Sequence, residues 1–355
     1  MAATGAFPGA HALLVAIANY RTVRNLPEAV INDADDIATV LQSSERCGYD
    51  PAKVRILRDA KATKDAILAE LDRLAAVAGP NDSVCIYFSG HGWRADHAEE
   101  SFLLPVDVAR ADLTGTAIAA STFSDKLHAI GANRVTVFLD ACHAGGAGAI
   151  KGASDPDGET LGISSKSIDM LSAGVGRAII ASSRLTETSL ILPGARNSAF
   201  TTALLEGLNG AADFYGEGVV KLFSLFEYVA DRVPAITADH QHPILRTKIE
   251  KNFAIALNLG RNAGAKGPGD ATTLLDSVRE LIVGLYPGGP ADRDIWERAG
   301  GDLSRLTLGR PGRSVWFEAL KLLERGGGGD NISIKKLIAE ALNDYPRNEH
   351  LLAYS

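Results

Sequence analysis

Apolar residues in the first two thirds of the chain follow two different spacings. Short, mostly apolar runs, several of them rich in β-branched and aromatic residues, predict strands at 11–18, 53–57, 82–88, 134–139 and 177–181. Between these runs, apolar residues recur every three or four positions, which predicts helices over 29–41, 63–78, 121–130, 198–207 and 219–233. Such alternation predicts an α/β domain with a mostly parallel sheet and helices on both faces.

Three further segments belong to the same region. Residues 101–105 are expected to form a short extended segment, and residues 242–249 a last strand. Pro243 is compatible with that strand because proline is tolerated near a strand start or at a sheet edge. Residues 144–176 break the alternation with Gly-rich and Ser-rich stretches. We expect a long loop there, and a loop of this length inside a compact domain is usually functional or disordered.

A second domain is expected after residue 271. Residues 259–271 form a flexible linker by their Gly-rich composition, and they separate a domain at 1–258 from one at 272–355. The apolar residues of 274–285 and 334–345 have helical spacing, and Pro290 and Pro311 stand where helices commonly start, so we expect a small all-α bundle of about four helices. Trp316 is expected in its core, the alternative being an exposed binding anchor.

Composition and charge exclude several classes of protein. The chain has 36 Lys and Arg against 43 Asp and Glu, a net charge of −7, and no basic block, which disfavours direct nucleic-acid binding. The apolar run at 12–18 is too short to span a bilayer, and no cationic segment precedes it as a secretory signal requires, so no membrane partner is expected. Three cysteines are too few for a disulfide framework. We expect a cytoplasmic protein.

Reactive side chains follow two of the expected strands where each breaks into glycine. His91 follows strand 82–88 within Ser-Gly-His-Gly, and Cys142 follows strand 134–139 within Asp-Ala-Cys-His-Ala-Gly-Gly. Open α/β sheets bind ligands at the carboxyl ends of their strands, so an imidazole and a thiol are expected to converge. The alternative for Cys142 is a small buried hydrophobe, which we favour for Cys47 and Cys85. His143 is better explained as a loop residue, because it is the sequence neighbour of Cys142.

These two motifs, about 50 residues apart, resemble those of the caspase-like cysteine peptidases, and among them the metacaspase-type branch of bacteria and eukaryotes. The resemblance covers about residues 11–255 and includes Asn-Ser-Ala-Phe-Thr at 197–201. It implies a caspase-like fold with a sheet of about six strands, and amide hydrolysis without a cofactor. Cys142 would attack the scissile carbonyl, and His91 would protonate the leaving amine and then activate water. The backbone N–H groups of Gly92 and Cys142 would bind the oxyanion.

Asp140 departs from the caspase pattern, in which Gln stands two residues before the nucleophile and the P1 side chain of the substrate is acidic. A carboxylate at this position favours Arg or Lys at P1 and repels Asp. The metacaspase resemblance adds Asp33 and Ser89 to the same pocket. From the residues alone, Asp33 is instead explained as a solvated acid in a cluster with Asp35 and Asp36.

Two further expectations depend on the resemblance. Some metacaspases bind calcium through several carboxylates, but only Asp107 and Asp125 lie near matching positions here, so calcium dependence finds little support. The 144–176 loop occupies the place where caspase-like enzymes are cut during maturation. We therefore expect cleavage after Lys151, Lys166 or Arg177.

The second domain resembles the small effector-associated domains of bacterial conflict-system proteins. The resemblance rests on Leu-Tyr-Pro at 285–287, Ala-Gly-Gly-Asp-Leu-Ser at 299–304 and Trp-Phe-Glu-Ala-Leu at 316–320. It implies that a partner protein with a like domain docks on residues 272–355, the alternative being a helical cap that stabilises the peptidase.

The sequence as a whole thus predicts a cysteine endopeptidase that cleaves proteins after Arg or Lys. The two resemblances imply a role in bacterial defence or regulated cell death, with activation by recruitment or cleavage. The alternative is a catalytically silent scaffold that acts through the helical domain.

Overall fold

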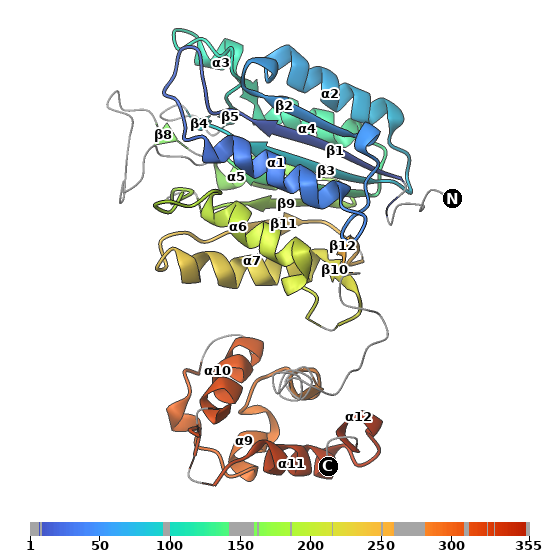
Figure 1. Cartoon of the computed structure of the whole chain (residues 1–355), viewed down its shortest axis with the longest axis vertical. Helices are drawn as coiled ribbons and strands as arrows, with labels where there is room; N and C mark the ends of the chain where they lie inside the picture. Colours follow the sequence, from blue (N-terminus) through green and yellow to red (C-terminus); the bar gives the residue numbers. More distant parts are fainter. Residues whose placement is uncertain are drawn as a thin grey trace. The chain divides into compact units, whose positions relative to one another are not determined.

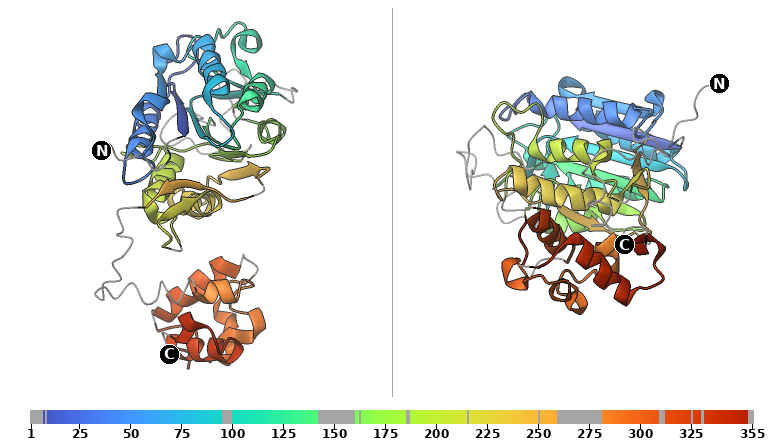
Figure 2. Two further views of the ribbon diagram at one scale, coloured as in Figure 1. Left: turned by 90° about the vertical axis from the view of Figure 1, so that its right-hand side faces the viewer. Right: turned by 60° about the horizontal axis from the view of Figure 1, so that its bottom comes forward.

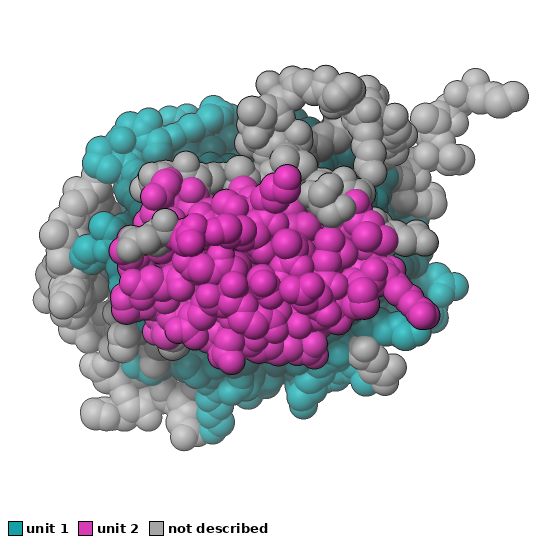
Figure 3. All heavy atoms as spheres, turned by 90° about the horizontal axis from the view of Figure 1, so that it is seen from below, with its two compact units in different colours: residues 1–263 teal, residues 264–355 magenta. Residues whose placement is uncertain are grey.

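The computed structural model describes residues 7, 9–94, 100–141, 160, 161, 163–184, 187–214, 216–249, 251–258, 281–308, 312–324, 326–329 and 331–352. The chain divides into two compact units, residues 1–263 and residues 264–355, which are coloured separately in Figure 3. The boundary between them falls within the residues expected to form a linker. Each unit buries an apolar core of its own.

A six-stranded sheet forms the middle of the first unit (Figure 1). All neighbouring strands pair in parallel except β11, which is antiparallel to β9 at one edge. The mostly parallel sheet of about six strands is thus confirmed. In spatial order the strands are β11 (Ile244–Thr247), β9 (Arg177–Ala181), β7 (Arg134–Asp140), β3 (Ser83–Ser89), β1 (Ala10–Ala16) and β2 (Val54–Arg58).

Helices cover both faces of this sheet (Figure 2). One layer contains α2 (Lys64–Val77), α4 (Ala120–Ala129) and α5 (Ser165–Leu171), and the other contains α1 (Ala29–Gln42), α6 (Ala199–Glu206) and α7 (Leu222–Ile236). The helix α2 illustrates how the sequence specifies them. Thr63 accepts a hydrogen bond from the N–H of Ala66, and Ile67, Leu71 and Leu74 are buried on one side. Because helices cover both faces, all seven residues of β1 are buried, as its unbroken apolar run requires.

Smaller elements surround the main sheet. A four-stranded antiparallel sheet contains β6 (Ile118–Ala119), β5 (Ser101–Leu103), β4 (Gly92–Arg94) and β8 (Thr160–Leu161), and β10 (Val219–Lys221) pairs with β12 (Ala254–Leu257). The short helix α3 spans Leu113–Thr116. Short 3₁₀ segments lie at Pro51–Lys53, Asp59–Lys61, Asp292–Asp294 and Leu303–Arg305, and a π-helical turn at Gly207–Ala211 extends α6.

The expectation of one long loop at 144–176 was wrong in its second half, where β8 and α5 form. Ser164 caps α5 by accepting a hydrogen bond from the N–H of Ser167 at 3.1 Å, and Ile168 and Leu171 are buried. Serine is unfavourable inside helices but favoured at their N-termini, and so the Ser-rich composition hid a helix start. The helix predicted at 219–233 likewise begins only at Leu222, after strand β10.

The second unit is helical among its described residues. It contains a helical segment at 281–285 and the helices α9 (Ile295–Arg298), α10 (Gly312–Glu324), α11 (Ile334–Asp344) and α12 (Glu349–Leu352). Trp296 and Trp316 are fully buried with ring centroids 6.0 Å apart, and Nε1 of Trp316 donates to the carbonyl of Tyr286 at 2.8 Å. The expectation that Trp316 belongs to the core is confirmed. In the described parts of both units, no helix is long and apolar enough to cross a membrane.

Candidate active site

His91 lies just beyond the end of β3 in a buried position. The residue is 4% exposed, and its Nε2 lies 2.8 Å from the carbonyl oxygen of Arg24. Because a carbonyl oxygen can only accept, Nε2 carries a proton and donates it to this hydrogen bond. The other nitrogen, Nδ1, is therefore the one through which His91 can take up and release a proton during a reaction.

Tyr20 fixes the same histidine from the side. The two ring centroids are 4.9 Å apart, and the tyrosine hydroxyl accepts a hydrogen bond from the backbone N–H of His91 at 2.8 Å. The hydroxyl also donates to the carbonyl of Leu104 at 3.2 Å. Burial raises the pKa of Tyr20, so the hydroxyl keeps its proton and can serve as donor and acceptor at once.

Glycines on both sides of His91 permit close approaches that no other residue allows. A Cβ atom on Gly90 would lie 2.7 Å from the hydroxyl of Tyr20, and one on Gly92 would lie 2.4 Å from the carbonyl oxygen of Ala141. Both distances are shorter than real Cβ contacts. The Gly92 contact also demonstrates that the backbone after β3 lies directly against the backbone at the end of β7.

The register of β3 and β7 brings the two motifs together. Ser89 is the direct partner of Asp140, and the N–H of Gly90 donates to the carbonyl of Asp140 at 3.3 Å. The two chain segments thus leave the sheet side by side, one leading to His91 and the other to Ala141. Cys142, and with it the second oxyanion donor expected from its N–H, lies outside the described residues, as does His143.

The three residues expected in a specificity pocket are all fully buried beside these strand ends. Asp33 comes from α1, Ser89 from β3 and Asp140 from β7. Ser198, at the start of α6, connects the two acids: its N–H donates to Oδ1 of Asp33 at 3.0 Å, and its hydroxyl donates to Oδ2 of Asp140 at 2.7 Å. Ser189 donates to the other oxygen of Asp140 at 2.5 Å.

Two carboxyl groups therefore share one buried site, and the donors that reach them in the described part of the chain are uncharged. Burial, reinforced by the negative charge of Asp140, raises the pKa of Asp33 well above its usual value. Hydrogen bonds from Ser198 and Asn197 oppose this rise. Oδ2 of Asp33 has no hydrogen bond of normal geometry among the described residues. Such a site would be stabilised by an incoming cation.

Four contributors to this site were not predicted from the sequence. They are Tyr20, the carbonyl of Arg24, Ser189 and Ser198. A weak signal existed for Ser198, because Ser-Ala-Phe-Thr has the pattern of a helix N-terminus. The other three lie in connecting segments whose positions follow from tertiary structure alone.

Comparison with known proteins places this site in a family. A family model described as the caspase domain matches residues 10–254, more than half of the chain. The chain belongs to the caspase-domain family. The matched residues include both strand ends described above. A second model, effector-associated domain 1, matches residues 273–355.

The alignments with individual relatives are shorter than the match to the family model. Metacaspase-1B of Aspergillus terreus is 34% identical over 153 residues, which are 38% of this chain and 38% of that protein. Metacaspase-1 of Yarrowia lipolytica is 32% identical over 146 residues, 36% of this chain and 30% of that protein. These alignments therefore span only 30% to 38% of the length of the two curated relatives. Among solved structures, a crystal structure of a Geobacter sulfurreducens protein is 20% identical with a TM-score of 0.49 and covers 69% of this chain and 95% of that one.

The three residues after which cleavage was expected differ in how accessible they are. Lys151 lies outside the described residues, and Lys166 is exposed in the first turn of α5. Arg177 is only 6% exposed in β9, where its guanidinium donates to the carbonyls of Ala132 at 2.7 Å and Ile130 at 2.6 Å. Cleavage after Arg177 would require β9 to leave the sheet. Arg177 is therefore a structural residue, and only Lys151 and Lys166 remain as candidates.

The weak calcium candidates also have structural surroundings. Oδ1 of Asp107 accepts the N–H of Lys64 at 2.9 Å and so caps α2 together with Thr63. Asp125 lies exposed on α4. Among the described residues, no group of three or more His, Cys, Asp or Glu side chains is placed to hold a metal ion.

Proposed function

We propose that this chain is a cysteine endopeptidase that cleaves proteins after Arg or Lys, with Cys142 as the nucleophile and His91 as its acid and base. The observation that carries the proposal is the pair of buried acids, Asp33 and Asp140, beside the strand ends that lead to His91 and Cys142. Membership in the caspase-domain family supports the reaction type. The acid pair supports the choice of substrate.

The residues can account for each bond that changes. The Cys142 thiol gives its proton to Nδ1 of His91, and the thiolate attacks the scissile carbonyl carbon, forming a C–S bond and an oxyanion. The N–H groups of Gly92 and Cys142 bind the oxyanion. When the C–N bond breaks, His91 returns the proton to the leaving amine. His91 then takes a proton from water, which hydrolyses the thioester and regenerates the thiol.

The contact between Nε2 of His91 and the Arg24 carbonyl supports this role for Nδ1. It holds the ring in one tautomer and one orientation, and it stabilises the imidazolium that forms when Nδ1 is protonated. Specificity rests on electrostatics. A guanidinium or ammonium group would pair with buried acids whose present donors are uncharged, whereas an acidic P1 side chain would add a further negative charge beside Asp140.

Fluorogenic peptides with P1 Arg, Lys, citrulline and Asp test the proposal directly. We expect cleavage of the Arg and Lys peptides, and little of the citrulline peptide, which matches Arg in shape but is neutral. The variants Cys142→Ala and His91→Ala should lose this cleavage. Cys47→Ala is the matched control, because the Cys47 thiol is buried and its pKa is raised by burial. Unchanged cleavage by Cys142→Ala would refute the mechanism, and a preference for P1 Asp would refute the pocket.

Residues 272–355 are proposed to dock a partner protein with a like domain, in a bacterial defence or regulated-death pathway. The match to effector-associated domain 1 supports docking, and the separate core around Trp316 favours it over a stabilising cap. Trp316→Ala removes a fully buried indole at a cost of about 3–5 kcal/mol to that core. A docking domain predicts unchanged hydrolysis of small peptides by the full-length variant. A stabilising cap predicts loss of activity and a lower melting temperature of the peptidase unit.

Processing is proposed after Lys151 or Lys166. Wild-type protein should yield two fragments on a denaturing gel, while Cys142→Ala stays intact. Lys151→Ala and Lys166→Ala then identify the cut. An active enzyme that remains intact would refute the need for processing.

A further inference from the structure

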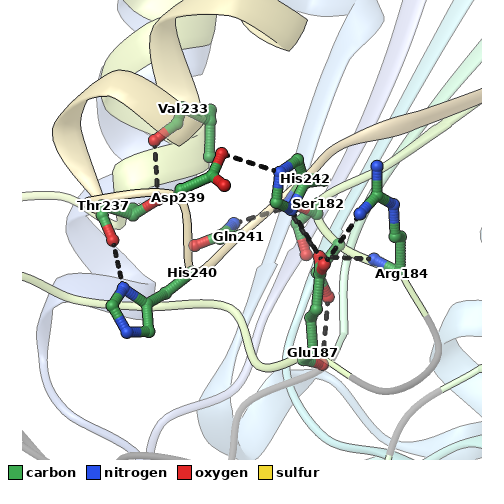
Figure 4. Close-up of polar contacts among 10 residues, drawn as sticks. Ser182, Arg184, Glu187, Val233, Thr237, Asp239, His240, Gln241 and His242 are labelled. Carbon is green, nitrogen blue, oxygen red and sulfur yellow. Dashed lines mark hydrogen bonds and ion pairs between the residues drawn. The ribbon is translucent and has the colours of Figure 1, made fainter.

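The connection between α7 and β11 contains a glutamine that is completely buried. Gln241 has no exposed surface, and both ends of its amide form hydrogen bonds, of which Figure 4 shows the one to Ser182. Oε1 accepts the N–H of Leu190 at 2.9 Å, and Nε2 donates to the carbonyl of Ser182 at 2.8 Å. One side chain therefore joins the end of β9 to a point eight residues further along the loop that follows it.

That loop carries Ser189 to the acidic pocket. Ser189 is 3% exposed and donates to Oδ1 of Asp140 at 2.5 Å. Nε2 of Gln241 lies 3.4 Å from the Ser189 hydroxyl, a long hydrogen bond in which serine accepts. The stronger constraint is the bond to Leu190, the next residue in the chain. The contacts thus run in sequence from Gln241 to Ser189 and from Ser189 to Asp140.

A second contact ties the same two loops together. The N–H of His242 donates to Oε2 of Glu187 at 2.7 Å, and Nδ1 of the same histidine lies 2.8 Å from Oε1 (Figure 4). The N–H of Arg184 also donates to Oε2 of Glu187, at 3.3 Å. The loop after β9 is therefore held at Glu187 as well as at Leu190.

The turn that buries Gln241 has an uncommon backbone. Ala238 and Asp239 have φ values of 49° and 65°, a left-handed conformation that costs a residue with a Cβ roughly 1–2 kcal/mol. The hydroxyl of Thr237 donates to the carbonyl of Val233, and the N–H of Asp239 donates to that of Pro234, both at 2.8 Å. The surrounding structure thus offsets local strain that accompanies the inward position of Gln241.

We propose that Gln241 is a positioning residue for the basic-specificity pocket, acting through Ser189 on the carboxylate of Asp140. The inference rests on the proposed function, because it assumes that Asp140 binds the P1 cation. Recognition of a planar guanidinium requires a carboxylate in one orientation. Ser189 and Ser198 each bind one oxygen of Asp140, so loss of the Ser189 contact frees the carboxylate to rotate. Ser198 is fixed by a helix start, whereas Ser189 lies in a loop and depends on Gln241.

The test is the ratio of kcat/KM for a P1 Arg peptide to that for the matching citrulline peptide. A purely structural defect lowers both values, whereas a displaced Asp140 lowers the ratio. Ser189→Ala removes a hydrogen bond to a charged group, and we expect the ratio to fall by about 10- to 100-fold. Gln241→Met keeps the length of the side chain without its hydrogen bonds, and we expect a fall of about 3- to 10-fold.

A double variant tests the route. If Gln241 acts through Ser189, Gln241→Met should add less than about twofold in the Ser189→Ala background. Ser189→Thr, which keeps the hydroxyl, should restore most of the ratio. His240→Asn is the matched control from the same turn, because His240 is exposed and its Nδ1 contacts the carbonyl of Thr237 rather than the loop after β9, and its ratio should stay within about twofold of wild type.

Three results would overturn the inference. The first is a Gln241→Met protein that has a wild-type circular dichroism spectrum and an unchanged Arg-to-citrulline ratio. The second is a double variant whose loss in this ratio equals the combined losses of the two single variants. If Gln241→Met does not fold, an unchanged ratio in Ser189→Ala is the third. A wild-type enzyme with no preference for Arg over citrulline would instead refute the proposed function, so the two failures are distinguishable.

Discussion

Replacing Asp33 by Asn should stabilise the protein at neutral pH and at the same time weaken recognition of Arg. Asp33 is fully buried, and burial together with the charge of Asp140 raises its pKa. The hydroxyl of Tyr87, also buried, is a titratable group near both acids. Asn is nearly the same size, and its Oδ1 can still accept the N–H of Ser198.

The sign and size of the effect follow from proton linkage. An unfolded Asp loses its proton at about pH 3.9, whereas folded Asp33 keeps its proton until its raised pKa is reached. Over that interval the folded state binds more protons, so wild-type stability falls as pH rises, by at most about 1.4 kcal/mol per pH unit. The asparagine of the variant cannot ionise. The stability advantage of Asp33→Asn should therefore grow from pH 4 upward and level off above the folded pKa.

Urea unfolding of wild type and Asp33→Asn between pH 4 and pH 8 measures this difference. Asp35→Asn is the matched control, because Asp35 lies on the same helix but forms a half-exposed ion pair with Arg58, which is worth at most about 1 kcal/mol. The same Asp33→Asn protein should lose about 10- to 100-fold in the Arg-to-citrulline ratio. A variant less stable than wild type, with the same pH profile, would refute the account of the buried acid pair.

Three further changes test the geometry around the site. Tyr20→Phe removes the hydroxyl that accepts the N–H of His91, and we expect kcat to fall about tenfold with little change in KM. An unchanged kcat would contradict a role of Tyr20 in positioning His91. Gly92→Ala places a Cβ 2.4 Å from the carbonyl oxygen of Ala141, so we expect a protein that still melts cooperatively but no longer cleaves peptides. Full activity of this variant would contradict the close approach of Gly92 to Ala141. Ala238→Gly relieves a left-handed residue and should raise the free energy of unfolding by about 0.5–1 kcal/mol, as measured by urea unfolding, while a lower stability would argue against strain in this turn.

The sequence was sufficient for the framework of the fold. Mostly apolar runs identified most strands of the main sheet, since strands covered on both faces consist largely of apolar residues. Glycine at the ends of β3 and β7 marked the place where His91 and Asp140 lie. The helix α5 was missed, because its serines are satisfied at long range: the hydroxyl of Ser164 donates to that of Ser167, and the Ser167 hydroxyl accepts the N–H of Ser101, a residue more than 60 positions away.

The specificity pocket could be predicted only in part. Asp140 was identified by its position two residues before Cys142, where caspases carry Gln, whereas Asp33 was added by the metacaspase resemblance alone, because its sequence neighbours suggest a solvated acidic cluster. Ser189 and Gln241 had no local signal. Each acts through tertiary hydrogen bonds over about 50 residues of separation, and no spacing rule connects a loop serine to a buried glutamine in another loop.

Hydrolysis of matched P1 Arg, citrulline and Asp peptides by wild type, Cys142→Ala and Cys47→Ala decides whether Cys142 is the nucleophile and whether the pocket selects a basic side chain. We expect wild type and Cys47→Ala to cleave the Arg peptide far faster than the other two peptides, and Cys142→Ala to cleave none of them. Cleavage that survives in Cys142→Ala, or a wild type that prefers Asp to Arg, would contradict this expectation.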